Sequence, residues 1–280
     1  MQTRRARPLL GTLVDIRIDH DGIDRARALA AIEAAFAEVA EVHRLMSFHE
    51  AASDVSRINR EASRAPVAVD PRTREVLALA LAFARASQGR FDPTVAAELV
   101  GWELLPRPAN APAPAGGADW RDVEMLDDGR IRSAKPLWID LGGVAKGYAV
   151  DRAIERLAAF GIEHACVNAG GDLRRMGPGL EPVHVRDPSA PHRTARTLLL
   201  GEGSVASSGS YFGCAHVDAM KRTPMSERCV SVVADRCVVA DALTKIVMSD
   251  PAAATPLLGT WDAEALVLER DGAELLGRAA

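Results

Sequence analysis

Hydrophobic positions along the chain follow two different spacings. Over residues 23–46, 71–89 and 146–161 they recur every third or fourth position, which is the period of a helix with one buried face. Short apolar runs between these segments are typical of buried strands, and they lie at 13–18, 138–141, 164–167 and 229–234. The pattern therefore predicts helices packed against a sheet.

The second half of the chain continues this mixture in shorter elements. Strands are predicted at 183–185 and 197–200, a helix within 235–250, a short helix at 251–259 and a terminal hairpin over 265–276. Strands outnumber clean β-α-β units, which favours a mixed α+β fold. We predict one compact domain over 1–280, with a surface loop rich in Pro, Ala and Gly at 105–117.

Two glycine turns stand at the ends of adjacent predicted elements. The turn Gly142-Gly143 precedes the helix that begins at Lys146, and the turn Gly170-Gly171 precedes Asp172. Glycine lets the backbone come close to a ligand, and the N–H groups at a helix start, with a lysine beside them, suit a phosphate. The other interpretation is an ordinary β-α-β unit whose glycines only make turns, and the glycines alone leave both open.

Composition and charge restrict the class of protein. The 280 residues are 48% hydrophobic and 26% charged with a net charge of −4, which is ordinary for a globular protein and provides no basic field for nucleic acid. No run approaches the roughly 18 apolar residues of a membrane span. The start, MQTRRARPLLGTLVDI, has neither an apolar leader segment nor a lipobox-like cysteine. We expect a cytoplasmic location, or a periplasmic one if a leader was removed.

The four cysteines do not form a metal-binding pattern. Cys166, Cys214, Cys229 and Cys237 lack CxxC pairs and zinc-type spacing with histidine. Cys166 and Cys229 lie in apolar runs, where a reduced thiol behaves as a small hydrophobic group. We expect buried thiols rather than a structural disulfide.

The central stretch also carries a specific resemblance. DLGGVAKGYAVDRA, followed by VNAGGD, closely resembles the signature of the ApbE family, the FAD:protein FMN transferases. Shorter pieces resemble further family motifs in the expected order: PLLGT at 8–12, MSF at 46–48 with SDVSRIN at 53–59, FDPTV at 91–95 and ADAL at 240–243. The resemblance covers nearly the whole chain and implies the same mixed α+β fold.

The resemblance implies a chemistry and a set of residues. The reaction is transfer of the FMN half of FAD to a Ser or Thr hydroxyl of an acceptor protein, with release of AMP. FAD would be contacted by Met46, Ser47, Asp92, Gly142, Gly143, Lys146, Asp151, Gly170, Gly171, Asp172, Ser208 and Gly209.

Several of these residues also have a structural interpretation. Met46 could be the last core residue of its helix, and Asp92 could be the N-cap of a short helix that follows Pro93. The small residues at 205–211 resemble a family turn against the flavin or phosphate, or they form a plain hairpin turn.

A magnesium ion is implied by the resemblance but meets a departure. The matched ligands are the Asp241 carboxylate and the Ala145 carbonyl, while the family's threonine ligand falls on Lys245, with Thr244 one place away. Asp241 and Lys245 form an i, i+4 pair on one helical face. The lysine could repel Mg²⁺, stand in for it on the pyrophosphate, or only pair with Asp241.

A second departure concerns proton transfer. When Asp218 is aligned to the family motif, the family's histidine falls on Ala215, and His216 is one place out of register. Asp218, His216 and Asp241 are the predicted catalytic residues. Two functions therefore remain open: an active FMN transferase, and an FAD-binding relative without transfer that serves as a carrier, sensor or interaction module.

Overall fold

The computed structural model describes residues 1–20, 22–209, 216–224, 228–269 and 272–277. The chain forms two compact units. The first contains Met1–Glu41, Lys146–Cys214 and Ser226–Ala280, and the second contains Val42–Ala145 and Ala215–Met225. Helices combined with antiparallel sheets confirm the predicted α+β class. The single domain over 1–280 stays a prediction.

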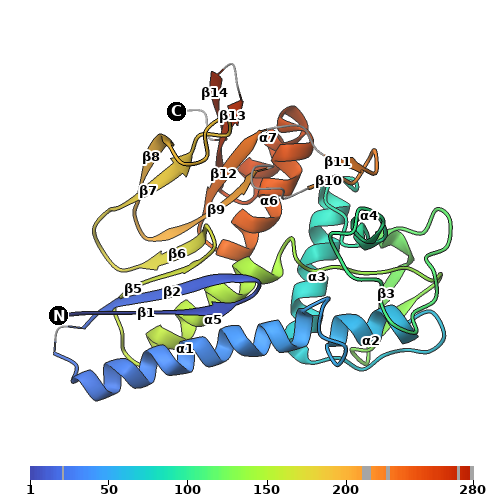
Figure 1. Cartoon of the computed structure of the whole chain (residues 1–280), viewed down its shortest axis with the longest axis horizontal. Helices are drawn as coiled ribbons and strands as arrows, with labels where there is room; N and C mark the ends of the chain where they lie inside the picture. The colour runs from blue at the N-terminus through green and yellow to red at the C-terminus, as the bar shows by residue number, and fades with distance from the viewer. Residues whose placement is uncertain (21, 210–215, 225–227, 270–271, 278–280) are drawn as a thin grey trace. The chain divides into compact units, whose positions relative to one another are not determined.

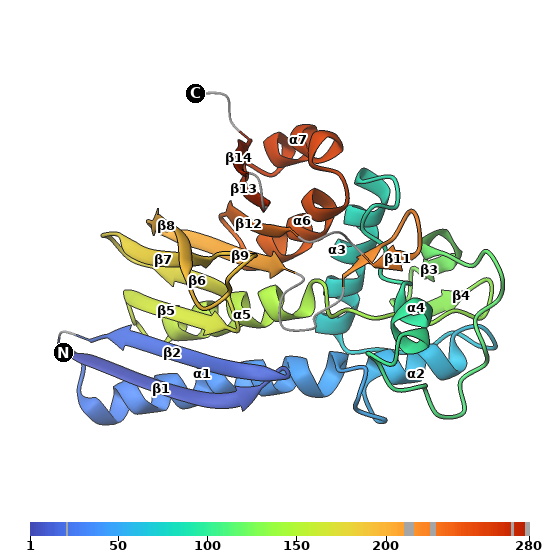
Figure 2. The same ribbon diagram turned by 45° about the horizontal axis from the view of Figure 1, so that its top comes forward.

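The first unit is built on an antiparallel sheet (Figures 1 and 2). Among the described residues its strand order is β1-β2-β5-β6-β9-β12-β13-β14. The strands are β1 (Gln2–Leu9), β2 (Thr12–Asp19), β5 (His164–Ala169), β6 (Asp172–Met176), β9 (Gly203–Gly209), β12 (Cys229–Ala234), β13 (Glu264–Glu269) and β14 (Gly272–Leu276). A separate ribbon joins β7 (Glu181–Arg186) to β8 (Thr194–Leu200), as predicted.

Edge strand β1 was not predicted from the sequence. It pairs along its whole length with β2, from Gln2 opposite Asp19 to Leu9 opposite Thr12. Its sequence QTRRARPL is polar and mostly exposed, so it lacks the apolar alternation by which a half-buried strand is recognised. Charged residues on an exposed edge also discourage pairing with another chain.

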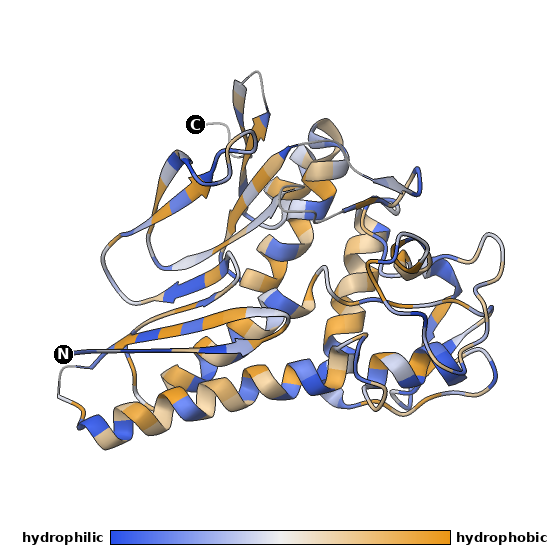
Figure 3. Cartoon of the chain, viewed as in Figure 1, coloured by the Kyte–Doolittle hydropathy of each residue, from blue (hydrophilic) through white to orange (hydrophobic). Residues whose placement is uncertain are grey.

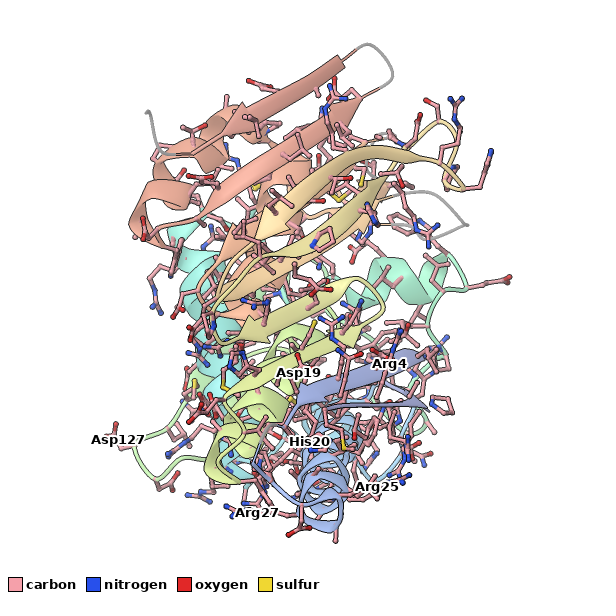
Figure 4. The ribbon with its side chains drawn as sticks, turned by 90° about the vertical axis from the view of Figure 1, so that its left-hand side faces the viewer. Arg4, Asp19, His20, Arg25, Arg27 and Asp127 are labelled. Atoms are coloured by element: carbon pink, nitrogen blue, oxygen red, sulfur yellow. The ribbon has the colours of Figure 1, made fainter. Side chains whose placement is uncertain are left out.

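The helices of the first unit are held to the sheet and to one another. α6 (Cys237–Ser249) packs against β9 and β12 and is followed by α7 (Pro251–Thr260). α5 (Ala145–Ala159) and the first part of α1 (Arg25–Met46) are linked through Arg27, whose guanidinium donates to the carbonyl of Phe160 at 2.9 Å. Figure 4 shows Arg27 near the start of α1.

The second unit contains shorter helices. They are α2 (Asp54–Glu61), α3 (Pro71–Ala86), α4 (Ala96–Gly101) and a 3₁₀ turn at Trp120–Asp122, with the strand pairs β3 (Val123–Met125) and β4 (Ile131–Ser133), and β10 (Val217–Asp218) and β11 (Thr223–Pro224). α3 is mostly hydrophobic in Figure 3. Its N-cap is Asp70, whose side chain accepts from the N–H of Arg72, with Pro71 in the first turn, as the sequence predicts.

The predicted strand at 138–141 is wrong. Trp138, Ile139 and Leu141 are buried, but the segment pairs with no strand among the described residues. Its backbone is satisfied instead by the side chain of Asn59, which bonds both the N–H and the carbonyl of Ile139, and by the carbonyl of Pro93, which accepts from the N–H of Asp140. The apolar run is buried, as predicted, but its backbone partners are a side chain and the carbonyl of Pro93 rather than a strand.

The predicted turn over 205–211 is also wrong for its described part. Residues 203–209 are strand β9, in register with β12 from Ser204 opposite Ala234 to Gly209 opposite Cys229. Small side chains suit this position because α6 packs directly against the strand. Ser210 and Tyr211 lie outside the described residues. The loop at 105–117 contains neither helix nor strand, in agreement with the sequence.

Candidate functional site

A buried cluster of charge lies where α5, β6 and α6 of the first unit meet. The Lys146 ammonium is 2.7 Å from Asp172 Oδ2 and 3.6 Å from Asp241 Oδ2. Lys245, one turn after Asp241 on α6, donates to Asp241 Oδ1. Both carboxylates are buried, while Lys146 is 31% exposed. The predicted site residues Lys146, Asp172 and Asp241 thus come together with Lys245.

The two carboxylates of the cluster differ in their electrostatic surroundings. Burial would raise the pKa of Asp241, but Lys146, Lys245 and the N–H of Gly147 outweigh burial and hold that pKa below its ordinary value. For Asp172, burial and the charge of Asp241 raise the pKa against the effect of Lys146. Burial disfavours the ammonium of Lys146, yet the two carboxylates prevail and raise its pKa. Lys146 therefore remains a cation at neutral pH.

Gly147 allows this cluster to form. A Cβ at Gly147 would lie 2.4 Å from the carbonyl oxygen of Cys237, so the starts of α5 and α6 approach closely only because no side chain intervenes. The N–H of Gly147 donates to Asp241 Oδ2 at 3.1 Å. This glycine was not predicted as a site residue, because its role depends on a helix that lies far away in sequence.

The turn between β5 and β6 sets the position of Asp172. Gly170 has φ +69° and a Cβ there would meet Thr12 Oγ1 at 2.5 Å, while Gly171 has φ +108° and open space. Asn168 Oδ1 accepts from the N–H of Gly171 at 2.9 Å and closes the turn. Gly170 is therefore required by the fold, whereas space beside Gly171 leaves room for a ligand.

Asp151 caps helix α6. Its Oδ1 accepts from the N–H of Cys237 at 2.9 Å and its Oδ2 accepts from the N–H of Val238 at 3.0 Å. Arg174 on β6 donates to Oδ1 at 2.9 Å. These contacts engage both carboxylate oxygens, so Asp151 fixes the start of the helix that carries Asp241. Its predicted contact with FAD stays a prediction.

Ser208 and Gly209 lie on β9, beside α6. The Ser208 hydroxyl bonds the Thr244 hydroxyl at 2.8 Å, and Thr244 donates in turn to the carbonyl of Asp241 at 2.7 Å. Both hydroxyls are buried. Strand and helix are thereby joined next to Asp241.

The second unit holds the remaining predicted residues. Met46 ends α1 and is 3% exposed, as expected for a core residue. Ser47 is half-buried, and its carbonyl accepts from the hydroxyl of Ser53, which is the N-cap of α2. These contacts explain the local fold, and the predicted flavin contacts of Met46 and Ser47 stay predictions.

Asp92 does not cap α4, whose N-cap is Val95. Instead Asp92 Oδ1 accepts from the N–H and hydroxyl of Thr94, and Oδ2 pairs with Arg222 at 2.8 Å. The N-cap interpretation is wrong because the turn through Pro93 and Thr94 separates Asp92 from the helix. Burial, partly offset by Thr94 and Arg222, raises the pKa of Asp92.

Asp218 and His216 lie at β10. Asp218 is buried, its Oδ1 accepts from the N–H groups of Met220 and Lys221, and its Oδ2 is 3.2 Å from the Lys221 ammonium. His216 precedes the strand and is half-buried. Ala215, where the family histidine would fall, lies outside the described residues.

Gly142, Gly143 and Ala145 form the turn into α5. The N–H of Gly142 donates to Asp140 Oδ1 at 3.1 Å, and the N–H of Ala145 donates to the carbonyl of Leu141 at 2.8 Å. Gly142 is exposed and Ala145 is buried. Ala145 ends the second unit and Asp241 belongs to the first.

The groups that surround the Asp241 carboxylate do not suit a magnesium ion. Mg²⁺ prefers oxygen ligands in near-octahedral geometry, whereas Asp241 is contacted by two ammonium groups and a backbone N–H. Within the described residues no three His, Cys, Asp or Glu side chains are grouped to hold a metal.

No helix in the described part of the chain has the length and apolarity needed to cross a membrane.

The cysteines agree with the expectation of thiols where they are described. Cys229 and Cys237 are buried and Cys166 is partly buried, and all three are thiols outside a disulfide. Burial raises the pKa of Cys166 to about 11. Cys214 lies outside the described residues.

Comparison with known proteins places this geometry in a family. The model of the ApbE family matches residues 10–266. The FAD:protein FMN transferase of Treponema pallidum is 26% identical over 233 residues, covering 74% of this chain and 64% of the relative. The one from Vibrio cholerae is 28% identical over 267 residues, covering 86% of this chain and 79% of the relative. The chain thus spans about two thirds of the length of the first relative and more of the second.

Solved structures agree in fold. The crystal structure of the ApbE protein from Thermotoga maritima has a TM-score of 0.83 and 28% identity, covering 98% of this chain and 96% of that one. The flavin transferase ApbE from Vibrio cholerae has a TM-score of 0.79 at 22% identity, with the same coverage. The second likeness concerns the fold alone.

Proposed function

Because the chain belongs to the ApbE family, we propose that it is an FAD:protein FMN transferase that moves the FMN moiety of FAD to a Ser or Thr hydroxyl of an acceptor protein, releasing AMP. The observation that carries the proposal is the family match over residues 10–266. Relatives named FAD:protein FMN transferase support it. FAD and an acceptor protein are then the partners.

The reaction is a displacement at phosphorus. The acceptor hydroxyl oxygen bonds to the FMN phosphorus, the bond from this phosphorus to the bridging oxygen breaks, and AMP leaves with that oxygen. Such a step depends on positioning and on cationic charge beside the phosphate oxygens. Lys146 and Lys245 supply that charge from the buried cluster, and the open backbone at Gly171 admits the ligand.

The hydroxyl proton needs an acceptor. We assign the role of proton acceptor to the β10 segment, where His216 and Asp218 are two residues apart. An imidazole or a carboxylate can take a proton near neutral pH. The carboxylate of Asp218 is already engaged by the N–H groups of Met220 and Lys221 and by the Lys221 ammonium, which favours His216 for this role.

Incubation of the chain with FAD and a candidate acceptor, followed by mass spectrometry, tests the proposal. The expected result is an acceptor heavier by one FMN, together with stoichiometric AMP. His216→Gln should lower the rate of transfer more than FAD affinity. FAD binding without transfer to any acceptor would instead support a flavin carrier or sensor.

A further inference from the structure

Lys245 stands where the resemblance implies a metal-binding threonine, and it already contacts the carboxylate that would bind the metal. Its ammonium donates to Asp241 Oδ1 and, at 3.1 Å, to the carbonyl of Asp241. Asp241 is fully buried and Lys245 is 15% exposed. A divalent ion at Asp241 Oδ1 would have to displace this ammonium.

The neighbouring hydroxyl offers no replacement ligand. Thr244 is fully buried and its Oγ1 is engaged by both Ser208 and the carbonyl of Asp241, at 2.8 and 2.7 Å. The remaining oxygen, Asp241 Oδ2, accepts from the N–H of Gly147 and lies 3.6 Å from Lys146. In the described part of the chain, the oxygens around Asp241 are thus satisfied by N–H, O–H and ammonium donors.

The charges of the cluster already balance. Each carboxylate is paired with an ammonium, Asp172 with Lys146 and Asp241 with Lys245. A bound Mg²⁺ would add two positive charges beside both ammonium groups in a poorly solvated site, where repulsion is strong. An incoming pyrophosphate would instead find two cations held in place before it binds.

We propose that Lys245, together with Lys146, takes the place of the divalent metal on the pyrophosphate of FAD, so that this chain binds FAD without a metal. This inference rests on the proposed function, because it takes FAD as the ligand. An ammonium has three donors, and Lys245 uses two of them on Asp241. The third can bond a phosphate oxygen, with the ammonium acting as a point charge.

The test measures FAD binding by flavin fluorescence in EDTA and in MgCl₂, with Mn²⁺ electron paramagnetic resonance as a direct probe of metal binding. The parent should have the same Kd for FAD in both buffers and should bind no Mn²⁺ tightly. Lys245→Met should weaken FAD binding by about 10- to 100-fold in either buffer, the loss expected for one charged hydrogen bond. Lys245→Arg should retain binding in EDTA because it keeps the charge.

Lys245→Thr restores an oxygen to the helical face of Asp241 and keeps the test decisive if Lys245→Met fails to fold. It should bind FAD weakly in EDTA, and its FAD binding should recover in MgCl₂.

Lys135→Met is the matched control: Lys135 pairs with Asp122 at 3.1 Å on the surface, so its removal should leave FAD binding unchanged. Parent binding that is lost in EDTA and restored by Mg²⁺ would overturn the inference, as would a Lys245→Thr variant identical to the parent.

Failure of this inference differs from failure of the proposed function. FAD binding in EDTA without any FMN transfer would contradict the transferase and leave the metal-free site supported. FMN transfer that occurs only with Mg²⁺, with no FAD bound in EDTA, would support the transferase and contradict the role of Lys245.

Discussion

The side-chain amide of Asn59 satisfies both backbone groups of Ile139: its Nδ2 donates to the Ile139 carbonyl at 3.0 Å and its Oδ1 accepts from the Ile139 N–H at 2.7 Å. The two residues are 80 positions apart and buried. Asn59 thus does for the segment before Gly142 what a neighbouring strand does elsewhere. The last residue of the family-like motif at 53–59 therefore has a structural role.

Replacing Asn59 with Asp should destabilise the chain. Aspartate still accepts from the Ile139 N–H but cannot donate, so a buried carbonyl loses its donor and faces a charge. We expect a loss of about 2–3 kcal/mol in the free energy of unfolding, measured in urea. The same change at exposed Asn110 should alter that free energy by less than about 0.5 kcal/mol. Equal stabilities of the two variants would contradict the assigned role.

Gly147→Ala should be strongly destabilising. Its Cβ would lie 2.4 Å from the carbonyl oxygen of Cys237 and 2.8 Å from the Cα of Val238, which are backbone atoms that cannot rotate away. We expect a loss of about 3 kcal/mol or more.

Gly101→Ala is the matched control, because Gly101 is helical with no atom within 4 Å of a Cβ. It should gain about 0.5–1 kcal/mol, because alanine loses less backbone entropy than glycine on folding. Thermal melts of both variants check the pair, and a Gly147→Ala variant that melts with the parent would refute close contact between α5 and α6.

Local pattern was sufficient for the elements with one apolar face. The periodicity of α1, α3, α5 and α6 and the apolar runs of β2, β5 and β12 predicted them within a few residues. Strand β1 could not be predicted, because its exposed residues do not alternate between apolar and polar. The small residues of β9 resemble a turn, and they make sense as a strand only once α6 is packed against them.

The candidate site divides in the same way. Lys146, Asp172 and Asp241 were found because they stand in recognisable motifs, and the structure brings them together. Thr12, Gly147 and Arg222 were missed as partners of the predicted residues, since each acts on a neighbour remote in sequence. The Asp-Pro step at 92–93 favoured an N-cap, but Thr94 competes for the same carboxylate.

The buried carboxyl of Asp92 should leave a signature in the pH dependence of stability. Burial, only partly offset by Thr94 and Arg222, raises its pKa above the ordinary 3.8. The folded chain then keeps the proton to higher pH than the unfolded chain, so this group's contribution to stability falls as pH rises from 3.8 through the folded pKa. Relative to Asp92→Asn, the parent should therefore lose stability over that interval, as measured by urea unfolding at several pH values.

Asp128→Asn gives the opposite sign as a control. Hydrogen bonds from Arg130 hold the pKa of Asp128 below its ordinary value, so the parent should gain stability relative to this variant as pH rises through the acid range. The effect should be small because the pair is exposed. Parallel trends for the two variants would show that Asp92 is not the buried group described here.

Lys146 should be coupled to Asp172 more strongly than a surface ion pair is coupled to its partner. Lys146→Met leaves the buried carboxylates of Asp172 and Asp241 facing each other without the cation between them, and we expect a loss of about 2–4 kcal/mol. Asp172→Asn in that background should recover part of the loss, because one of the two facing charges is gone. A double-mutant cycle isolates this coupling, expected at about 1–3 kcal/mol.

The pair Arg132 and Glu124, 2.5 Å apart and about half exposed, provides the reference cycle, with Arg132→Met and Glu124→Gln. Its coupling should stay below about 1 kcal/mol, because water screens the two charges. Added salt should reduce the surface coupling further and leave that of Lys146 and Asp172 nearly unchanged, since screening by ions requires access to solvent. If the two cycles gave the same coupling and the same salt dependence, Lys146 would be a solvated lysine and not a preorganised cation for the pyrophosphate.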